Sequence, residues 1–97
     1  MAKTLYAEFT VKPGCEARVA EMMCTLTEQV RNEPGNVLFL PYTREAAPNE
    51  YFVFEVYADD AAFSEHITAD YGKVFNDELA ELIEGEGSVL TWLTEAE

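Results

Sequence analysis

The spacing of hydrophobic residues alternates between two periods along this chain, and the order of the changes constrains the fold most strongly. From Leu5 to Val11 every second residue is apolar, which is the period of a strand. From Cys15 to Asn32 apolar residues recur at intervals of three or four, which indicates an amphipathic helix. The later segments repeat the two patterns: strands at 37–44, 51–57 and 89–94, and helical spacing between Asp59 and Leu82.

Turn and cap residues divide these segments. The Glu33-Pro34-Gly35 run ends the first helix, because proline restricts the residue before it and glycine permits the turn. Residues 46–49 are predicted to connect two strands as a hairpin loop. Asp59 is suited to cap the second helical region, which is either one long helix or two helices joined at Thr68 or Gly72.

The resulting order is strand, helix, strand, strand, helix, strand. This βαββαβ order predicts an α+β ferredoxin-like fold, in which two helices cover one face of a four-stranded antiparallel sheet. The 97 residues suffice for one such domain, spanning 1–97, and leave no room for a second. Pro41 places the second strand at an edge of the sheet or marks a bulge.

The third strand lacks a polar face, although two helices can cover only one side of the sheet. Large apolar side chains left in water forgo about 1.5 to 3 kcal/mol each, and contiguous patches usually mark an interface. We therefore expect a homodimer packed through its sheets. The residues concerned are Phe52, Phe54 and Val56 on one side of this strand, and Tyr51, Val53, Glu55 and Tyr57 on the other.

Charge excludes several classes of partner. Six Lys and Arg against nineteen Asp and Glu give a net charge of −13, which repels nucleic acids and anionic membranes. No apolar run is long enough to span a bilayer, and the first residues lack a signal-peptide pattern, so a cytoplasmic protein is expected. Cys15 and Cys24 are expected to be free thiols. With a single histidine, no metal site is predicted, and no nucleotide-binding or serine-hydrolase motif occurs.

His66, the only histidine, is the clearest candidate for chemistry. Its spacing from Phe63 and Ile67 places it on or beside the stripe that faces the sheet. An inward imidazole in a cavity is suited to act as a general base, because its unperturbed pKa lies near neutrality. The alternative is a core histidine that donates to a backbone carbonyl.

Glu55 interrupts an apolar strand, and a buried carboxylate needs a hydrogen-bond donor or a positive charge. A contact with His66 is geometrically reasonable and would orient the imidazole ring. Two other arrangements remain open, a wet edge of the sheet and a pair with Arg44 across the hairpin.

Several aromatic residues are candidates for the walls of a pocket, with their phenol and indole groups as donors. Aromatics at helical spacing are more often plain core. The residues are Tyr42, Tyr57, Tyr71, Phe75 and Trp92.

Three segments and one histidine together resemble the antibiotic biosynthesis monooxygenase (ABM) domain, with likeness from Phe9 almost to Leu82. They are 33–39 (Glu-Pro-Gly-Asn-Val-Leu-Phe), 51–57 (Tyr-Phe-Val-Phe-Glu-Val-Tyr), 59–63 (Asp-Asp-Ala-Ala-Phe) and His66. The resemblance implies a dimeric ferredoxin-like domain with a pocket between helices and sheet in each subunit. Haem-degrading members carry Asn, Trp and His near the positions of Ala7, His66 and Asn76, which argues against haem as a ligand here.

The resemblance implies a cofactor-independent monooxygenase that acts on a small quinol or phenol with O2. His66 is then the general base and Glu55 its orienting partner. The remaining expected substrate-binding residues are Asn36 and Tyr71 as donors to the oxyanion, with Leu40, Tyr57, Phe75 and Trp92 as apolar walls.

Family membership does not settle the reaction. One alternative is an isomerase that uses the same base on a small carbonyl compound, phosphorylated in one branch of the family. Another is a non-catalytic dimeric module that binds a small apolar ligand. Oxygen consumption separates the first two, because isomerisation uses none.

Overall fold

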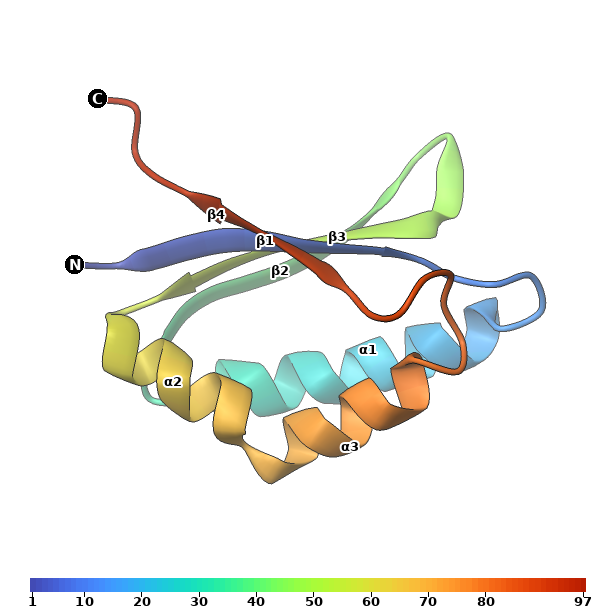
Figure 1. The fold of residues 1–97 in the computed structure, drawn as a ribbon, viewed down its shortest axis with the longest axis horizontal. Helices are drawn as coiled ribbons and strands as arrows, with labels where there is room; N and C mark the ends of the chain where they lie inside the picture. The colour runs from blue at the N-terminus through green and yellow to red at the C-terminus, as the bar shows by residue number, and fades with distance from the viewer.

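Three helices lie on one side of a four-stranded antiparallel sheet in the computed structural model, which describes residues 1–97 (Figure 1). The strands lie in the order β2-β3-β1-β4, so the predicted ferredoxin-like α+β fold is confirmed. In chain order the elements are β1 (Lys3–Thr10), α1 (Glu16–Arg31), β2 (Asn36–Arg44), β3 (Ala47–Tyr57), α2 (Asp60–Thr68), α3 (Asp70–Leu79) and β4 (Val89–Leu93).

The second helical region is two helices that meet at Ala69. Its ψ of 136° is extended and interrupts the helical hydrogen bonding there. Asp59 caps α2 as predicted, because its carboxylate accepts a hydrogen bond of 2.8 Å from the Ala62 amide. The two helices make the V-shaped outline below the sheet in Figure 1.

The hairpin between β2 and β3 is tighter than the sequence predicted. Arg44 pairs with Ala47, and only Glu45 and Ala46 lie between these two residues. The prediction of a loop at 46–49 is therefore wrong. Pro48 lies in a register shift of the hairpin, between Ala47, which pairs with Arg44, and Tyr51, which pairs with Thr43. Because it has no partner in the ladder there, its missing amide hydrogen does not disrupt the pairing. Pro41 lies in an edge strand, as expected for a residue without an amide hydrogen.

Alternation along β3 separates two environments. Val53, Glu55 and Tyr57 are buried beneath the helices, whereas Phe52, Phe54 and Val56 lie on the other side and are only partly buried. No helix covers that second side, which we call the open sheet face (Figure 1). From neighbouring strands it also carries Tyr6, Leu38, Leu40 and Tyr42, which pair directly with the outward residues of β3.

The core lies between the helices and the inner sheet face. Alternate residues of β1, including Ala7 and Phe9, meet the apolar stripe of α1, whose buried members recur at helical spacing. That stripe consists of Val19, Met22, Met23, Leu26 and Val30. No helix in the structure has both the length and the hydrophobicity needed to cross a membrane.

Removing the cap of α2 tests the helix that carries the histidine. We expect Asp59→Ala to lower the free energy of unfolding by about 1 kcal/mol, because it leaves the Ala62 amide without its acceptor. Asp59→Asn keeps a capping oxygen and should lose much less. Urea unfolding of all three proteins at one protein concentration checks this. Equal stability of the alanine variant and the parent would contradict the cap assignment.

Candidate active site

A cavity of about 210 Å³ lies between the helices and the inner face of the sheet. Twelve of its seventeen lining residues are hydrophobic, so it suits a small and largely apolar ligand. The polar side chains in the lining are Glu55, His66, Asn76 and Ser88. Among the apolar ones are Ala7, Leu26, Phe39, Phe63, Phe75 and Leu90.

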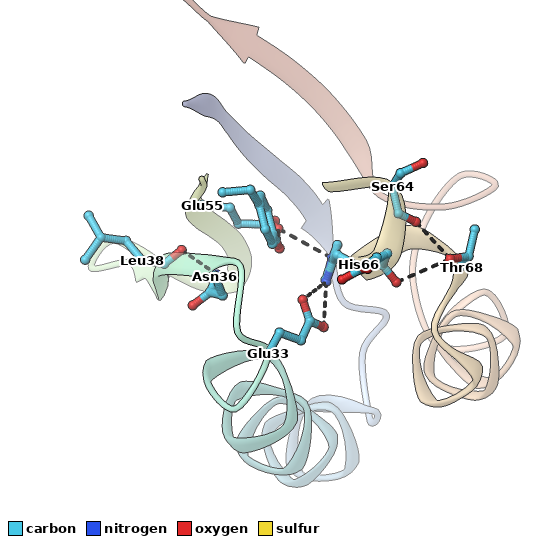
Figure 2. A network of polar contacts seen from close by, with 9 residues as sticks. Glu33, Asn36, Leu38, Glu55, Ser64, His66 and Thr68 are labelled. Carbon is cyan, nitrogen blue, oxygen red and sulfur yellow. Dashed lines mark hydrogen bonds and ion pairs between the residues drawn. The ribbon is translucent and has the colours of Figure 1, made fainter. Parts of the chain in front are cut away.

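His66 enters this lining from the last turns of α2. Its Nδ1 lies 3.0 and 3.2 Å from the two carboxylate oxygens of Glu33, in the loop between α1 and β2 (Figure 2). Its ring packs on Tyr57, with centroids 4.8 Å apart, and on Phe63, at 6.0 Å. The imidazole is 17% exposed, so it is neither a fully enclosed core group nor a surface group.

Glu55 approaches the same imidazole from the other side, as Figure 2 shows. Its Oε1 lies 3.8 Å from His66 Nε2 and accepts a 2.7 Å hydrogen bond from the Tyr57 hydroxyl. Burial raises the pKa of the Glu55 carboxyl, while the Tyr57 hydrogen bond and the imidazole oppose the rise. Burial and the adjacent Glu55 also raise the pKa of the Tyr57 phenol, so Tyr57 remains a donor.

The site therefore holds one imidazole between two carboxyl groups, with an apolar chamber beside it. Such an imidazole can accept a proton from a ligand. The arrangement differs from a core histidine that donates to a backbone carbonyl. Glu55 does not pair with Arg44, which instead contacts Glu50 at 2.9 Å.

No lysine or arginine lines the cavity. All six lysines and arginines have acceptors elsewhere on the molecule, and the cavity therefore lacks a cation for a phosphate group. Their contacts are Lys3 with Asp60, Lys12 with the Glu81 carbonyl, Arg18 with Glu21 and Glu78, Arg31 with the Phe39 carbonyl, Arg44 with Glu50, and Lys73 with Asp77.

Of the residues predicted for the site, His66, Glu55 and Phe75 line the cavity. Tyr57 lies directly behind them, fully buried, and contacts both Glu55 and His66. Because β3 alternates, Glu55 and Tyr57 share the inner face and can form a hydrogen bond along the strand.

Four other residues predicted to bind the substrate lie outside the cavity lining, and so does Tyr42, a candidate for the pocket wall that lies on the open sheet face instead. Asn36 donates to the Leu38 carbonyl of its own strand, at 3.0 Å, and Leu40 lies on the open sheet face opposite Phe54. Strand alternation explains why Leu40 faces away from the helices, because its neighbour Phe39 takes the inward position.

The other two residues are aromatic, and the first of them, Tyr71, packs against the core. Tyr71 lines an outer groove between α1 and α3. Trp92 is 47% exposed and packs edge-on against Phe63, with Lys3 over its ring. Their residue type was informative, but sequence spacing did not show which side of each element would face the chamber.

Sequence reasoning missed Glu33, the nearest polar partner of the histidine. An acidic residue immediately before a Pro-Gly turn is a weak signal, since it reads as a loop residue in solvent. Asn76 was also not predicted for this site; it lies on α3 within the apolar lining and supplies a neutral donor and acceptor there.

The model of the antibiotic biosynthesis monooxygenase family matches residues 4–85. This chain belongs to that family. Among curated proteins, no sequence matches this ABM chain. Its family is one of monooxygenase type.

Solved structures share the fold closely. A protein from Mycobacterium tuberculosis is 18% identical with a TM-score of 0.90, covering 100% of the ABM chain and 97% of that chain. A predicted antibiotic biosynthesis monooxygenase from Caulobacter crescentus is 25% identical with a TM-score of 0.89, covering 99% and 91%. A predicted monooxygenase from Fusobacterium nucleatum is 27% identical with a TM-score of 0.89, covering 96% of the ABM chain and 42% of that chain.

Replacing Glu55 by glutamine tests its buried state. The pKa of the Glu55 carboxyl is raised in the folded protein. The stability that the protonated carboxyl contributes is therefore present at low pH, and it is lost as the pH rises from 4.5 through the pKa of the folded state. Glu55→Gln has no such loss and keeps an oxygen for Tyr57. We therefore expect the stability of the variant relative to the parent to increase from pH 5 to 8.

Urea unfolding, followed by Trp92 fluorescence at each pH, measures this difference. Glu65→Gln, at an exposed position on the same helix as His66, is the matched control and should show little pH dependence. If the stability of Glu55→Gln relative to the parent stays constant or falls as the pH rises, the pKa of Glu55 is not raised in the folded protein.

Proposed function

We propose that this protein is a cofactor-independent monooxygenase that oxidises a small quinol or phenol with O2. The observation that carries the proposal is the apolar cavity of about 210 Å³, with the only histidine of the chain in its wall between two carboxyl groups. Family membership supports monooxygenase chemistry. The cavity volume suits a single aromatic ring or two fused rings.

The reaction starts with transfer of the phenolic proton to His66. The substrate anion then gives one electron to O2, and the resulting superoxide and substrate radical combine at a ring carbon. Collapse of the peroxide leaves one oxygen atom on the ring as a quinone carbonyl and releases the other as water. One simple phenol and one O2 thus give one benzoquinone and one water, so the substrate supplies all the electrons and no cofactor is required.

The charges around the cavity favour a neutral substrate. Glu55 is the acid in the lining, no lysine or arginine faces the chamber, and the chain carries a net charge of −13. A phosphorylated compound would enter without a cationic partner, which disfavours the phosphorylated branch of the isomerase alternative.

We also propose that two copies pack through the open sheet face. The pairs Tyr6–Phe54 and Phe54–Leu40 join across strands, and Tyr6 also packs on Phe52 with ring centroids 5.6 Å apart. Tyr42 is 59% exposed in one chain, and a second copy would remove this apolar surface from water.

The general-base role is tested by His66→Ala in an oxygen-electrode assay over a panel of quinols and polycyclic phenols. Loss of the base should lower kcat/KM about 10²- to 10⁴-fold for any quinol that the parent oxidises. Glu65→Gln, adjacent and exposed, should retain the parent rate. Unchanged oxygen uptake in His66→Ala would remove the base from the mechanism.

The same panel separates the alternatives. Conversion of a carbonyl compound without oxygen uptake would identify an isomerase. Ligand binding without turnover of any panel member would indicate a binding module.

The dimer is tested by light scattering at micromolar concentration. We expect a mass of two chains for the parent and one chain for Phe54→Glu, because the substitution puts a charge at the centre of the open sheet face. Val74→Glu is a matched control, since Val74 is 69% exposed on the outer side of the helices. A one-chain mass for the parent would contradict the proposal, and circular dichroism verifies that both variants fold.

A further inference from the structure

Glu33 stands at an unusual place for a residue that contacts an imidazole. It belongs to no helix or strand, yet both of its carboxylate oxygens lie within 3.2 Å of His66 Nδ1. Its side chain is 17% exposed, the same fraction as that of His66. The contact joins residues 33 positions apart, so the turn that carries Glu33 must be held against α2.

Backbone hydrogen bonds fix that turn at both ends. The Glu33 amide donates to the Val30 carbonyl at 2.9 Å, which continues the end of α1. The Asn36 amide donates to the Glu33 carbonyl at 3.1 Å, and the Ala58 amide donates to the Gly35 carbonyl at 2.9 Å. The turn is therefore tied to α1, to the start of β2 and to the segment just after β3.

Gly35 brings this turn into direct contact with α2. A Cβ at Gly35 would lie 2.3 Å from Ala62 Cβ, a distance that real structures do not tolerate. Its distance from Ala62 Cα would be 3.2 Å, a tight contact that a shift of a few tenths of an ångström relieves. Only glycine allows such an approach to the first turn of the helix that carries His66. The approach sets the spacing between the Glu33 carboxylate and the imidazole.

The proton on the imidazole follows from this contact. An ionised carboxylate only accepts hydrogen bonds, and a neutral imidazole has one nitrogen that donates and one that accepts. An ionised Glu33 at Nδ1 therefore favours the tautomer in which Nδ1 donates and the free lone pair is on Nε2.

We propose that Glu33 is a positioning residue, held by the Gly35–Ala62 contact, which keeps the proton of His66 on Nδ1 and presents Nε2 to the ligand. This inference rests on the proposed function only in making Nε2 the atom that takes the substrate proton. The preferred tautomer itself is a property of the ligand-free protein.

The opposite side of the ring supports this assignment. Nε2 lies 3.8 Å from Glu55 Oε1, too far for a hydrogen bond, while Oε1 already accepts from Tyr57. Nε2 makes no hydrogen bond within the protein and is free to accept one from a substrate hydroxyl. Glu33 from the loop and Glu55 from β3 are the charged groups that face the imidazole.

The test is nitrogen NMR of the ¹⁵N-labelled full chain at pH 8, where the only histidine gives one unambiguous imidazole spectrum. We expect a pyrrole-type Nδ1 and a pyridine-type Nε2 in the parent. Glu33→Gln retains a carbonyl acceptor and should keep this pattern, whereas Glu33→Leu removes the acceptor and should shift the proton toward Nε2. A parent protonated on Nε2, or on both nitrogens, would overturn the proposal, and so would a Glu33→Leu spectrum identical to the parent's.

The glycine contact is tested separately. Gly35→Ala should give the same loss of the Nδ1-protonated form, and the double variant Gly35→Ala/Ala62→Gly should restore it by removing the clashing Cβ. Gly87→Ala is the control, since a Cβ there meets nothing within 4 Å. If Gly35→Ala does not fold, the double variant still decides: failure to recover the parent spectrum would contradict the contact's role.

Kinetics distinguish this inference from the proposed function. With a quinol that the parent oxidises, Glu33→Leu should lower kcat/KM about 10- to 100-fold, with substantial recovery in Glu33→Gln. The expected tautomers without oxygen uptake on any quinol would leave the positioning role intact and refute the oxygenase. Oxygen uptake that depends on His66, together with a tautomer that Glu33→Leu does not change, would support the oxygenase and refute the positioning role of Glu33.

Discussion

Burial of the Glu55 carboxyl is the constraint around which the rest of the site is arranged. The alternation of β3 places this group beneath the helices, where an unpaired charge is costly. The next inward residue, Tyr57, offsets part of this cost by donating a hydroxyl hydrogen bond of 2.7 Å to Glu55. His66 on α2 brings its Nε2 within 3.8 Å of the same carboxyl oxygen. The polar cluster therefore exists because one strand carries an acid where its pattern demands an apolar residue.

Much of the fold could be predicted because it follows from local patterns. Periods of two and of three or four located the elements, and strand alternation grouped Val53, Glu55 and Tyr57 on one side of β3. Which side would face the helices was not predicted; the structure shows that it is this one. The interruption at Ala69 was less predictable, because no proline marks it. The hairpin before β3 was predicted, but its loop was placed too late along the chain, because Pro48 and Asn49 are typical loop residues although the strand pairing reaches Ala47.

The candidate site was only partly predictable, because some of its contacts join residues that lie far apart in the sequence. His66 and Glu55 are unusual residue types for their local patterns, so each could be singled out without a structure. Glu33 could not, because its contact depends on how closely a glycine turn approaches a distant helix. Leu40 and Trp92 show the opposite difficulty: their types suited a pocket, but strand orientation and packing placed them outside it.

The acidic surroundings bear on how the proposed oxidation would run. A phenolate formed in this chamber has no lysine or arginine beside it, so the imidazolium of His66 is its nearest cation. Glu33 and Glu55 draw on that same positive charge, which leaves less of it to stabilise the substrate anion. An anion stabilised less strongly gives up an electron more readily. In this reaction the electrostatics of the site therefore favour the step that must follow deprotonation, the transfer of an electron to O2.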